Sequence, residues 1–146
     1  MLIHRPVAEV FEAFTDPAFT SRFWFTKSSG KLETGNKVQW DWKMYAISSQ
    51  VDVKAIERNK RNLVEWLSAG SKPTTIEWRF NPRARDTTFV TITNTGFSGN
   101  GDQVVDLAID SMGGFSLVLA GLKALLEHNI ALNLVADHAP EALVKH

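Results

Sequence analysis

The stretch DSMGGFSLVLAGLKALLEHN, residues 110–129, combines apolar residues at helical spacing with three glycines, Gly113, Gly114 and Gly121. Glycine costs up to about 1 kcal/mol relative to alanine inside a helix, so three glycines in one helix require a compensating contact. We therefore expect this helix to lie against a concave sheet, where the missing side chains let bulky tryptophans approach the helix backbone.

The helical region is predicted to have two parts. A short helix is expected from Asp102 to about Asp110, and a longer one from about Met112 to His128, capped by Asp110 or Ser111 and ended by Asn129. The longer helix repeats apolar residues at positions i, i+3 or i+4, and i+7, which gives it one face suited to burial. That face consists of Phe115, Val118, Leu119, Leu122, Leu125 and Leu126.

The middle of the chain alternates apolar and polar residues with the period of two that a half-buried strand requires. The clearest case is KVQWDWK, residues 37–43, and four later segments repeat the rhythm. Successive strands joined by short turns, each with one polar face, favour an antiparallel meander. The residues predicted to face the helix, none of which can ionise, are Val38, Trp40, Trp42, Val51, Val53, Val64, Trp66, Ile76, Trp78, Phe80, Val90 and Ile92.

These patterns predict an α+β protein in which six or seven curved antiparallel strands wrap around a long C-terminal helix and enclose a hydrophobic cavity. The chain has 146 residues, of which 44% are hydrophobic. This is enough for one substantial core, so we expect a single domain over residues 1–146.

Composition excludes several classes of function. Sixteen basic residues balance sixteen acidic ones, without a basic run, so a nucleic-acid partner is not expected. The chain has no cysteine, and its start, MLIHRPVAEV, lacks the apolar core of a signal peptide. No uncharged apolar run approaches the length of about 18 residues needed for a membrane span. A soluble, cytoplasmic protein is therefore expected.

Aromatic residues on the predicted inner face have two interpretations. Four of the five tryptophans lie there, and such residues most often simply fill a core. A charge-free aromatic lining is also what a cavity for an apolar small molecule requires. On the second interpretation, the candidate ligand-binding residues are Trp24, Trp40, Trp42, Val53, Trp66, Trp78, Phe80, Ile92, Phe115, Leu119 and Leu122.

Motifs for catalysis, metals and cofactors are absent from the sequence pattern. Gly30 and Gly35 have the spacing that opens a phosphate loop, but the residues after them do not match, and the four histidines lack paired metal-ligand spacing. Asp102, Asp106 and Asp110 repeat every fourth residue and are interpreted as a solvated helix face. We expect no catalytic residue, metal or cofactor. If a reaction occurs in the cavity, the candidates for acid-base catalysis come from helices and loops. They are Glu9, Asp16, Arg22 and His128.

Several motifs, in this order and spacing, together resemble the START-like superfamily of helix-grip domains. More narrowly, they are similar to the bacterial branch related to the C-terminal domain of the activator of the heat-shock protein ATPase. The resemblance covers nearly the whole chain. It rests on Pro6-Val7 with Val10-Phe11, Thr15-Asp16-Pro17, Phe23-Trp24-Phe25, Thr93 through Phe97, and Gly113-Gly114-Phe115 through Leu122-Lys123 to Leu126-Glu127-His128.

The resemblance implies a curved sheet gripping a C-terminal helix, around a cavity that binds lipids, polyketides or other hydrophobic molecules in relatives. Two positions depart from the pattern: only Met1 to Arg5 precede the proline motif, where relatives have a full first strand, and Phe115 stands where many have tryptophan. The sheet edge is therefore expected to be open to a partner.

Three functions follow as hypotheses. The preferred one is binding of a small hydrophobic molecule without a chemical step. The alternatives are a cyclase- or hydrolase-like reaction in the same cavity, which needs an ionisable residue facing inward, and a protein-interaction role with a chaperone partner. A homodimer is a further alternative.

Overall fold

The computed structural model describes residues 1–67 and 72–144, and its fold is α+β. The strands are β1 (Leu2–Ile3), β2 (Lys27–Ser28), β3 (Lys37–Trp42), β4 (Ile47–Glu57), β5 (Arg61–Trp66), β6 (Thr74–Ala84) and β7 (Thr87–Thr95). The helices are α1 (Val7–Thr15), α2 (Pro17–Thr20), α3 (Gly101–His128) and α4 (Leu134–Asp137), with short 3-10 turns η1 (Lys43–Tyr45) and η2 (Pro140–Ala142).

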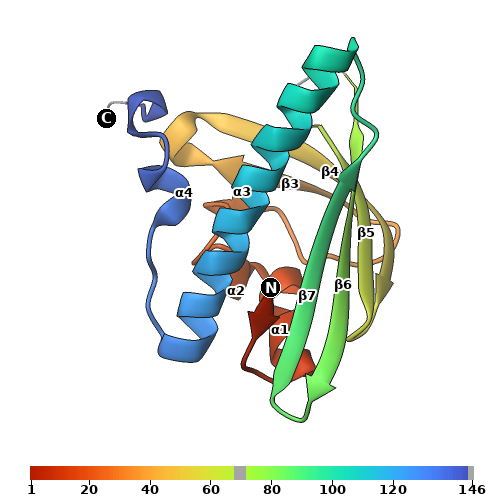
Figure 1. Cartoon of the computed structure of the whole chain (residues 1–146), viewed down its shortest axis with the longest axis vertical. Coiled ribbons are helices and arrows are strands. Elements are labelled where there is room, and N and C mark those ends of the chain that lie inside the picture. Colours follow the sequence, from red (N-terminus) through yellow and green to blue (C-terminus); the bar gives the residue numbers. More distant parts are fainter. Residues whose placement is uncertain (68–71, 145–146) are drawn as a thin grey trace.

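All seven strands form one antiparallel sheet in the order β1-β7-β6-β5-β4-β3-β2. The sheet curves, and α3 runs diagonally across its open side (Figure 1). Register shifts between Val53 and Ala55 in β4, and between Pro82 and Ala84 in β6, contribute to this curvature, because a bulge bends its strand and increases the twist. The predicted helix-grip architecture is thereby confirmed.

The alternation predicted for the strands is also confirmed. Trp40 and Trp78 are almost completely buried on the side of the sheet that faces α3, and Trp66 is partly buried there. The other predicted inner residues are buried as well, apart from Ile92, which is partly buried at the edge of the core. The sheet therefore presents one apolar face to the helix, as its period of two requires.

The division of the last third into two helices is wrong. A single helix, α3, runs without interruption from Gly101 to His128. Its N-cap is Asn100, not Asp110 or Ser111: the Asn100 side chain accepts a hydrogen bond from the Gln103 N–H, and the Gln103 side chain accepts one from the Asn100 N–H. This reciprocal capping satisfies two of the free amides at the helix start. Asn129, in the left-handed conformation with φ 53°, ends the helix as predicted.

A close packing contact is found at only one of the three helix glycines, and its partner is a phenylalanine and not the predicted tryptophan. A Cβ atom added at Gly121 would lie 3.4 Å from the Phe23 side chain and carbonyl, so this glycine admits a close neighbour. A Cβ at Gly113 or Gly114 would meet nothing within 4 Å. The expected contact with tryptophans is therefore wrong at this pair, because the helix backbone there stands away from the sheet.

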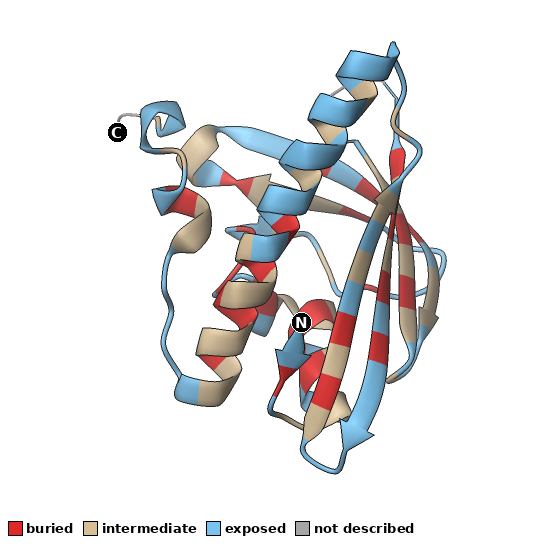
Figure 2. Cartoon of the chain, in the orientation of Figure 1, coloured by how far each residue is buried: buried red, intermediate tan, exposed pale blue. Residues whose placement is uncertain are grey.

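The two halves of α3 differ in burial. Every buried residue of the helix lies in its C-terminal half, and these are Phe115, Val118, Gly121, Leu122 and Leu125. In the N-terminal half, Val105, Ile109 and Met112 are 55%, 64% and 74% exposed. The contrast is visible along the helix in Figure 2. Of the described helices, α3 is the one long and apolar enough to cross a bilayer by length and composition, a test that core helices of soluble proteins also pass.

The C-terminal end of α3 is tied to the start of the chain. Lys123 donates a hydrogen bond to the Leu2 carbonyl at 2.8 Å, and the Arg5 side chain donates one to the Leu126 carbonyl at 2.8 Å. The His4 N–H donates to the Glu127 carboxylate at 3.1 Å. These contacts, which span more than 120 residues of sequence, anchor the packed half of the helix beside β1.

The first strand is short. Leu2 pairs with Phe89 and Ile3 with Thr88, and the Met1 and Val90 backbones exchange hydrogen bonds. Within the described sheet, the outer edge of β7 beyond Val90 has no strand partner. The open edge expected from the short start is thus present.

A candidate ligand-binding cavity

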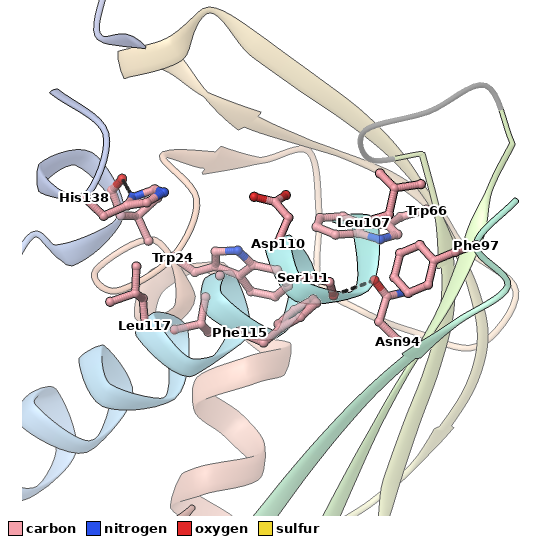
Figure 3. A pocket seen from close by; sticks show the side chains of 13 residues that line it. Trp24, Trp66, Asn94, Phe97, Leu107, Asp110, Ser111, Phe115, Leu117 and His138 are labelled. Carbon is pink, nitrogen blue, oxygen red and sulfur yellow. Dashed lines mark hydrogen bonds between the residues drawn. The ribbon is translucent and has the colours of Figure 1, made fainter. Parts of the chain in front are cut away.

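A partly open cavity of about 160 Å³ lies between α3, the sheet and the C-terminal tail, by which we mean residues 130–144 (Figure 3). We call it the main cavity because of its aromatic lining, although the two cavities described below are larger. Its walls come from the segment after α2, from β5, from the end of β7 with the following loop, from the middle of α3, and from the tail. The lining residues are Trp24, Trp66, Asn94, Phe97, Leu107, Asp110, Ser111, Gly114, Phe115, Leu117, Val118, Val135 and His138.

Aromatic rings form one side of the main cavity. The ring of Trp24 lies 5.9 Å from that of Trp66 and 5.7 Å from that of Phe115, and the latter two are 6.0 Å apart. Behind them, Trp24 packs at 4.8 Å against Trp40. Such tilted and edge-to-face pairs stabilise a rigid aromatic wall. The buried indole N–H of Trp66 has no hydrogen-bond partner among the described residues.

One hydrogen bond joins α3 to the sheet beside the cavity. The Ser111 hydroxyl donates to the Asn94 side-chain oxygen at 2.9 Å. The Asn94 amide nitrogen in turn donates to the Thr74 hydroxyl and the Thr75 carbonyl, both at 2.9 Å. Asn94 is therefore held from two directions, and it presents a fixed acceptor to the helix.

The tail forms the opposite wall and is held by Tyr45. The Tyr45 hydroxyl donates hydrogen bonds to the carbonyls of Val135 and Ala136, the latter at 3.2 Å. His138 lies at the cavity mouth, with its Nδ1 atom 2.6 Å from the Val135 carbonyl. Because a carbonyl only accepts, Nδ1 carries a proton. Burial, and then the charge of Asp137, raise the pKa of the Tyr45 phenol.

Two further cavities adjoin the main one. The second cavity, about 280 Å³, lies on the other flank of α3 against β7, and it shares Asn94, Phe97, Ser111 and Phe115 with the main cavity. The third cavity, about 380 Å³, lies beyond Trp24 and Trp66. One turn of α3, from Ser111 to Phe115, thus stands between the main and second cavities.

The structure separates the predicted ligand-binding residues into three groups. Trp24, Trp66 and Phe115 line the main cavity. Trp42 lines the third cavity, and Ile92 and Leu119 line the second. The remaining candidates line none of these three cavities because they are packed deep in the core; they are Trp40, Val53, Trp78, Phe80 and Leu122.

Sequence reasoning missed much of the polar and tail lining. Asp110 and His138 are the ionisable residues that line the main cavity within the described chain, and neither was among the ionisable candidates. Asp110 was interpreted as part of a solvated face, and it is indeed exposed at the mouth. The described residues contain no group of three His, Asp or Glu side chains that could hold a metal ion.

A curved antiparallel sheet gripping one helix, with a cavity between them, defines a helix-grip domain. The chain belongs to the family of Activator of Hsp90 ATPase homolog 1-like proteins, whose model matches residues 4–127. The comparison with curated proteins finds no significant match.

Solved structures share this fold. The protein SSP2350 from Staphylococcus saprophyticus is 27% identical and superposes with a TM-score of 0.74 over 90% of this chain and 91% of its own. The Aha1 dimer from Colwellia psychrerythraea is 17% identical, with a TM-score of 0.71 over 88% and 92%. DynU16, a protein of the dynemicin biosynthetic locus, is 23% identical, with a TM-score of 0.73 over 90% of this chain and 46% of its own.

Proposed function

We propose that the protein binds a small hydrophobic molecule in the main cavity, without a chemical step. The observation that carries this proposal is the aromatic wall of Trp24, Trp66 and Phe115 beside unoccupied volume. Ligand sites are typically apolar concavities with a few polar groups that orient the ligand, and Asp110 and His138 lie at this mouth. The likeness to DynU16, from a biosynthetic locus, supports a small-molecule role.

The volume bounds the ligand. About 160 Å³ is close to the roughly 150 Å³ of an apolar protein cavity that holds benzene. In this conformation the main cavity therefore accommodates about one aromatic ring. A larger ligand requires movement of a wall or use of the neighbouring cavities.

A titration with phenol, which has a single aromatic ring, followed by NMR shifts and by tryptophan fluorescence, tests the proposal. Leu107 lines the main cavity, so Leu107→Trp fills it and is expected to weaken binding at least tenfold. Val105→Trp is the matched control, because Val105 lies on the same helix turn but is exposed and does not line this cavity. It is expected to leave the Kd within twofold. Equal affinities in both variants, or no retained or added ligand across a broad apolar panel, contradict the proposal.

A cyclase- or hydrolase-like reaction is a second candidate, favoured by Asp110 and His138 in the lining of the same cavity. A carboxylate and an imidazole are the side chains most used for proton transfer. Mass spectrometry of a ligand recovered after incubation tests this. Conversion that is lost in Asp110→Asn or His138→Gln, with binding retained, supports a reaction, whereas an unchanged ligand contradicts it.

A protein-interaction role follows from family membership alone. An ATPase assay with the cognate chaperone tests it, and an unchanged ATPase rate contradicts it. The Aha1 dimer supports a homodimer as well, and analytical ultracentrifugation decides between monomer and dimer. The cytoplasmic location, the absence of a membrane span and the single domain over residues 1–146 stay predictions from the sequence.

A further inference from the structure

The N-terminal half of α3 is bounded by glycines at both ends. Before it, the loop after β7 contains Gly96 and Gly99 with φ values of 91° and 130°, a region that side-chain-bearing residues rarely adopt. Gly113 and Gly114 lie at its C-terminal end, inside the helix. The segment between them begins with the Asn100 capping box, which keeps its first turn helical independently of the sheet.

This segment is loosely held by the rest of the protein. None of residues 101–114 is buried. Among the residues that the structure describes, its one side-chain hydrogen bond to the sheet is that from Ser111 to Asn94. The main and second cavities lie on its two flanks. By contrast, the half that follows is packed against the sheet and tied to β1.

The glycine pair has no packing role, because a Cβ at either position would meet nothing within 4 Å. It nevertheless lowers the helix propensity of the two adjoining positions, which lie where the packed half of α3 begins. Glycine pairs are among the recognised sites of helix bending.

From these observations we infer that residues 101–112 form a lid that pivots about Gly113–Gly114 and admits the ligand to the main cavity. The inference rests on the proposed binding function and adds how the site is opened. Breaking the bond between Ser111 and Asn94 and tilting the lid widens the gap between Ser111 and the sheet, where the main and second cavities adjoin. The ligand class is thereby extended from one aromatic ring to fused-ring molecules that span both cavities.

Amide hydrogen exchange in the free protein tests the pivot without a ligand. Opening at the glycine pair breaks the helix hydrogen bonds that cross it, donated by the amides of residues 114–117. We expect these amides to exchange faster than those of residues 120–126. Gly113→Ala should slow them about fivefold, the factor corresponding to the propensity difference of about 1 kcal/mol. Gly101→Ala is the matched control, because a Cβ there also meets nothing and the residue lies at the far end of the lid.

Stopped-flow binding of 1-anilinonaphthalene-8-sulfonate tests the access role. Because the bound fused-ring probe holds the lid tilted, Gly113→Ala should lower the association rate and raise the Kd by a similar factor, and Ser111→Ala should raise the association rate and lower the Kd. Gly101→Ala should leave them as in the wild type.

The outcomes separate the lid from the binding function. Equal protection of residues 114–117 and 120–126 overturns the lid, whether or not the probe binds. Fast exchange at the pivot combined with binding rates that do not respond to Gly113→Ala or Ser111→Ala overturns its role in access. A wild-type protein that binds neither this probe nor phenol contradicts the proposed function, and the exchange data still decide whether the pivot opens.

Discussion

The two halves of α3 share one continuous helix but differ in what surrounds them. The C-terminal half buries Phe115, Val118 and Leu122 against the sheet and is hydrogen-bonded to the first residues of the chain. The N-terminal half is also rich in apolar residues, yet Ile109 and Met112 face solvent. The difference shows that apolar residues at helical spacing define a helix but do not show whether the rest of the fold reaches far enough to cover it.

Truncating one leucine in each half of α3 is the strongest test of this difference in packing. Leu122 is completely buried, so Leu122→Ala should destabilise the protein by about 3 kcal/mol through lost burial and a cavity. Leu107 is only partly buried beside an existing cavity, so Leu107→Ala should cost less than about 1 kcal/mol. Urea unfolding measures both values. Similar losses at the two positions would show that the halves are equally packed.

Alanine substitution at the helix glycines tests the same difference in packing, with a smaller expected effect on stability. The Gly113→Ala/Gly114→Ala double variant should raise the free energy of unfolding by up to about 2 kcal/mol, because helix propensity improves and no contact is strained. Gly121→Ala should gain less, since its Cβ would meet Phe23 at 3.4 Å. Thermal unfolding of the three proteins gives the order, and a destabilised double variant would contradict the absence of contacts at the pair.

Removing the hydroxyl of Tyr45 tests the wall opposite α3. Tyr45→Phe loses the hydrogen bonds to the tail carbonyls and should cost about 1 kcal/mol, with faster amide exchange in α4. The wild type should show the same loosening at alkaline pH. Because folding raises the pKa of this phenol, its contribution to stability is fully present below the unfolded pKa of about 10 and is lost as pH rises through the higher folded pKa. If the amide exchange rates of α4 change neither in Tyr45→Phe nor at alkaline pH, the Tyr45 hydroxyl does not hold the tail.

Much of the fold follows from local pattern. The strands were predicted correctly because a sheet with one solvent-exposed face and one buried face imposes a period of two on its strands. Trp40 and Trp78 on the buried face are examples. The break predicted before Met112 was wrong because Asp110 and Ser111, residue types that favour an N-cap, were taken as a helix start, whereas the Asn100 cap and the packed second half support one continuous helix. Propensity at two positions is a weak signal against such tertiary support.

The candidate site was less predictable. The period of two assigns a residue to one face of the sheet but does not say where along the strand a cavity lies. It therefore did not separate Trp66, beside the main cavity, from Trp78, deep in the core. Val135 and His138 reach the cavity because Tyr45 and Met44 bind the tail by hydrogen bonds, and the bond from Tyr45 to Val135 spans 90 residues of sequence. No local pattern contains that contact.

The sheet ends on both sides in a strand of only two residues, β1 at one edge and β2 at the other. Long exposed edges invite strands of other molecules, and very short terminal strands are one means by which natural sheets discourage such pairing. At the β1 edge this protection is incomplete, because within the described sheet β7 beyond Val90 has no strand partner and stays free to pair with another strand.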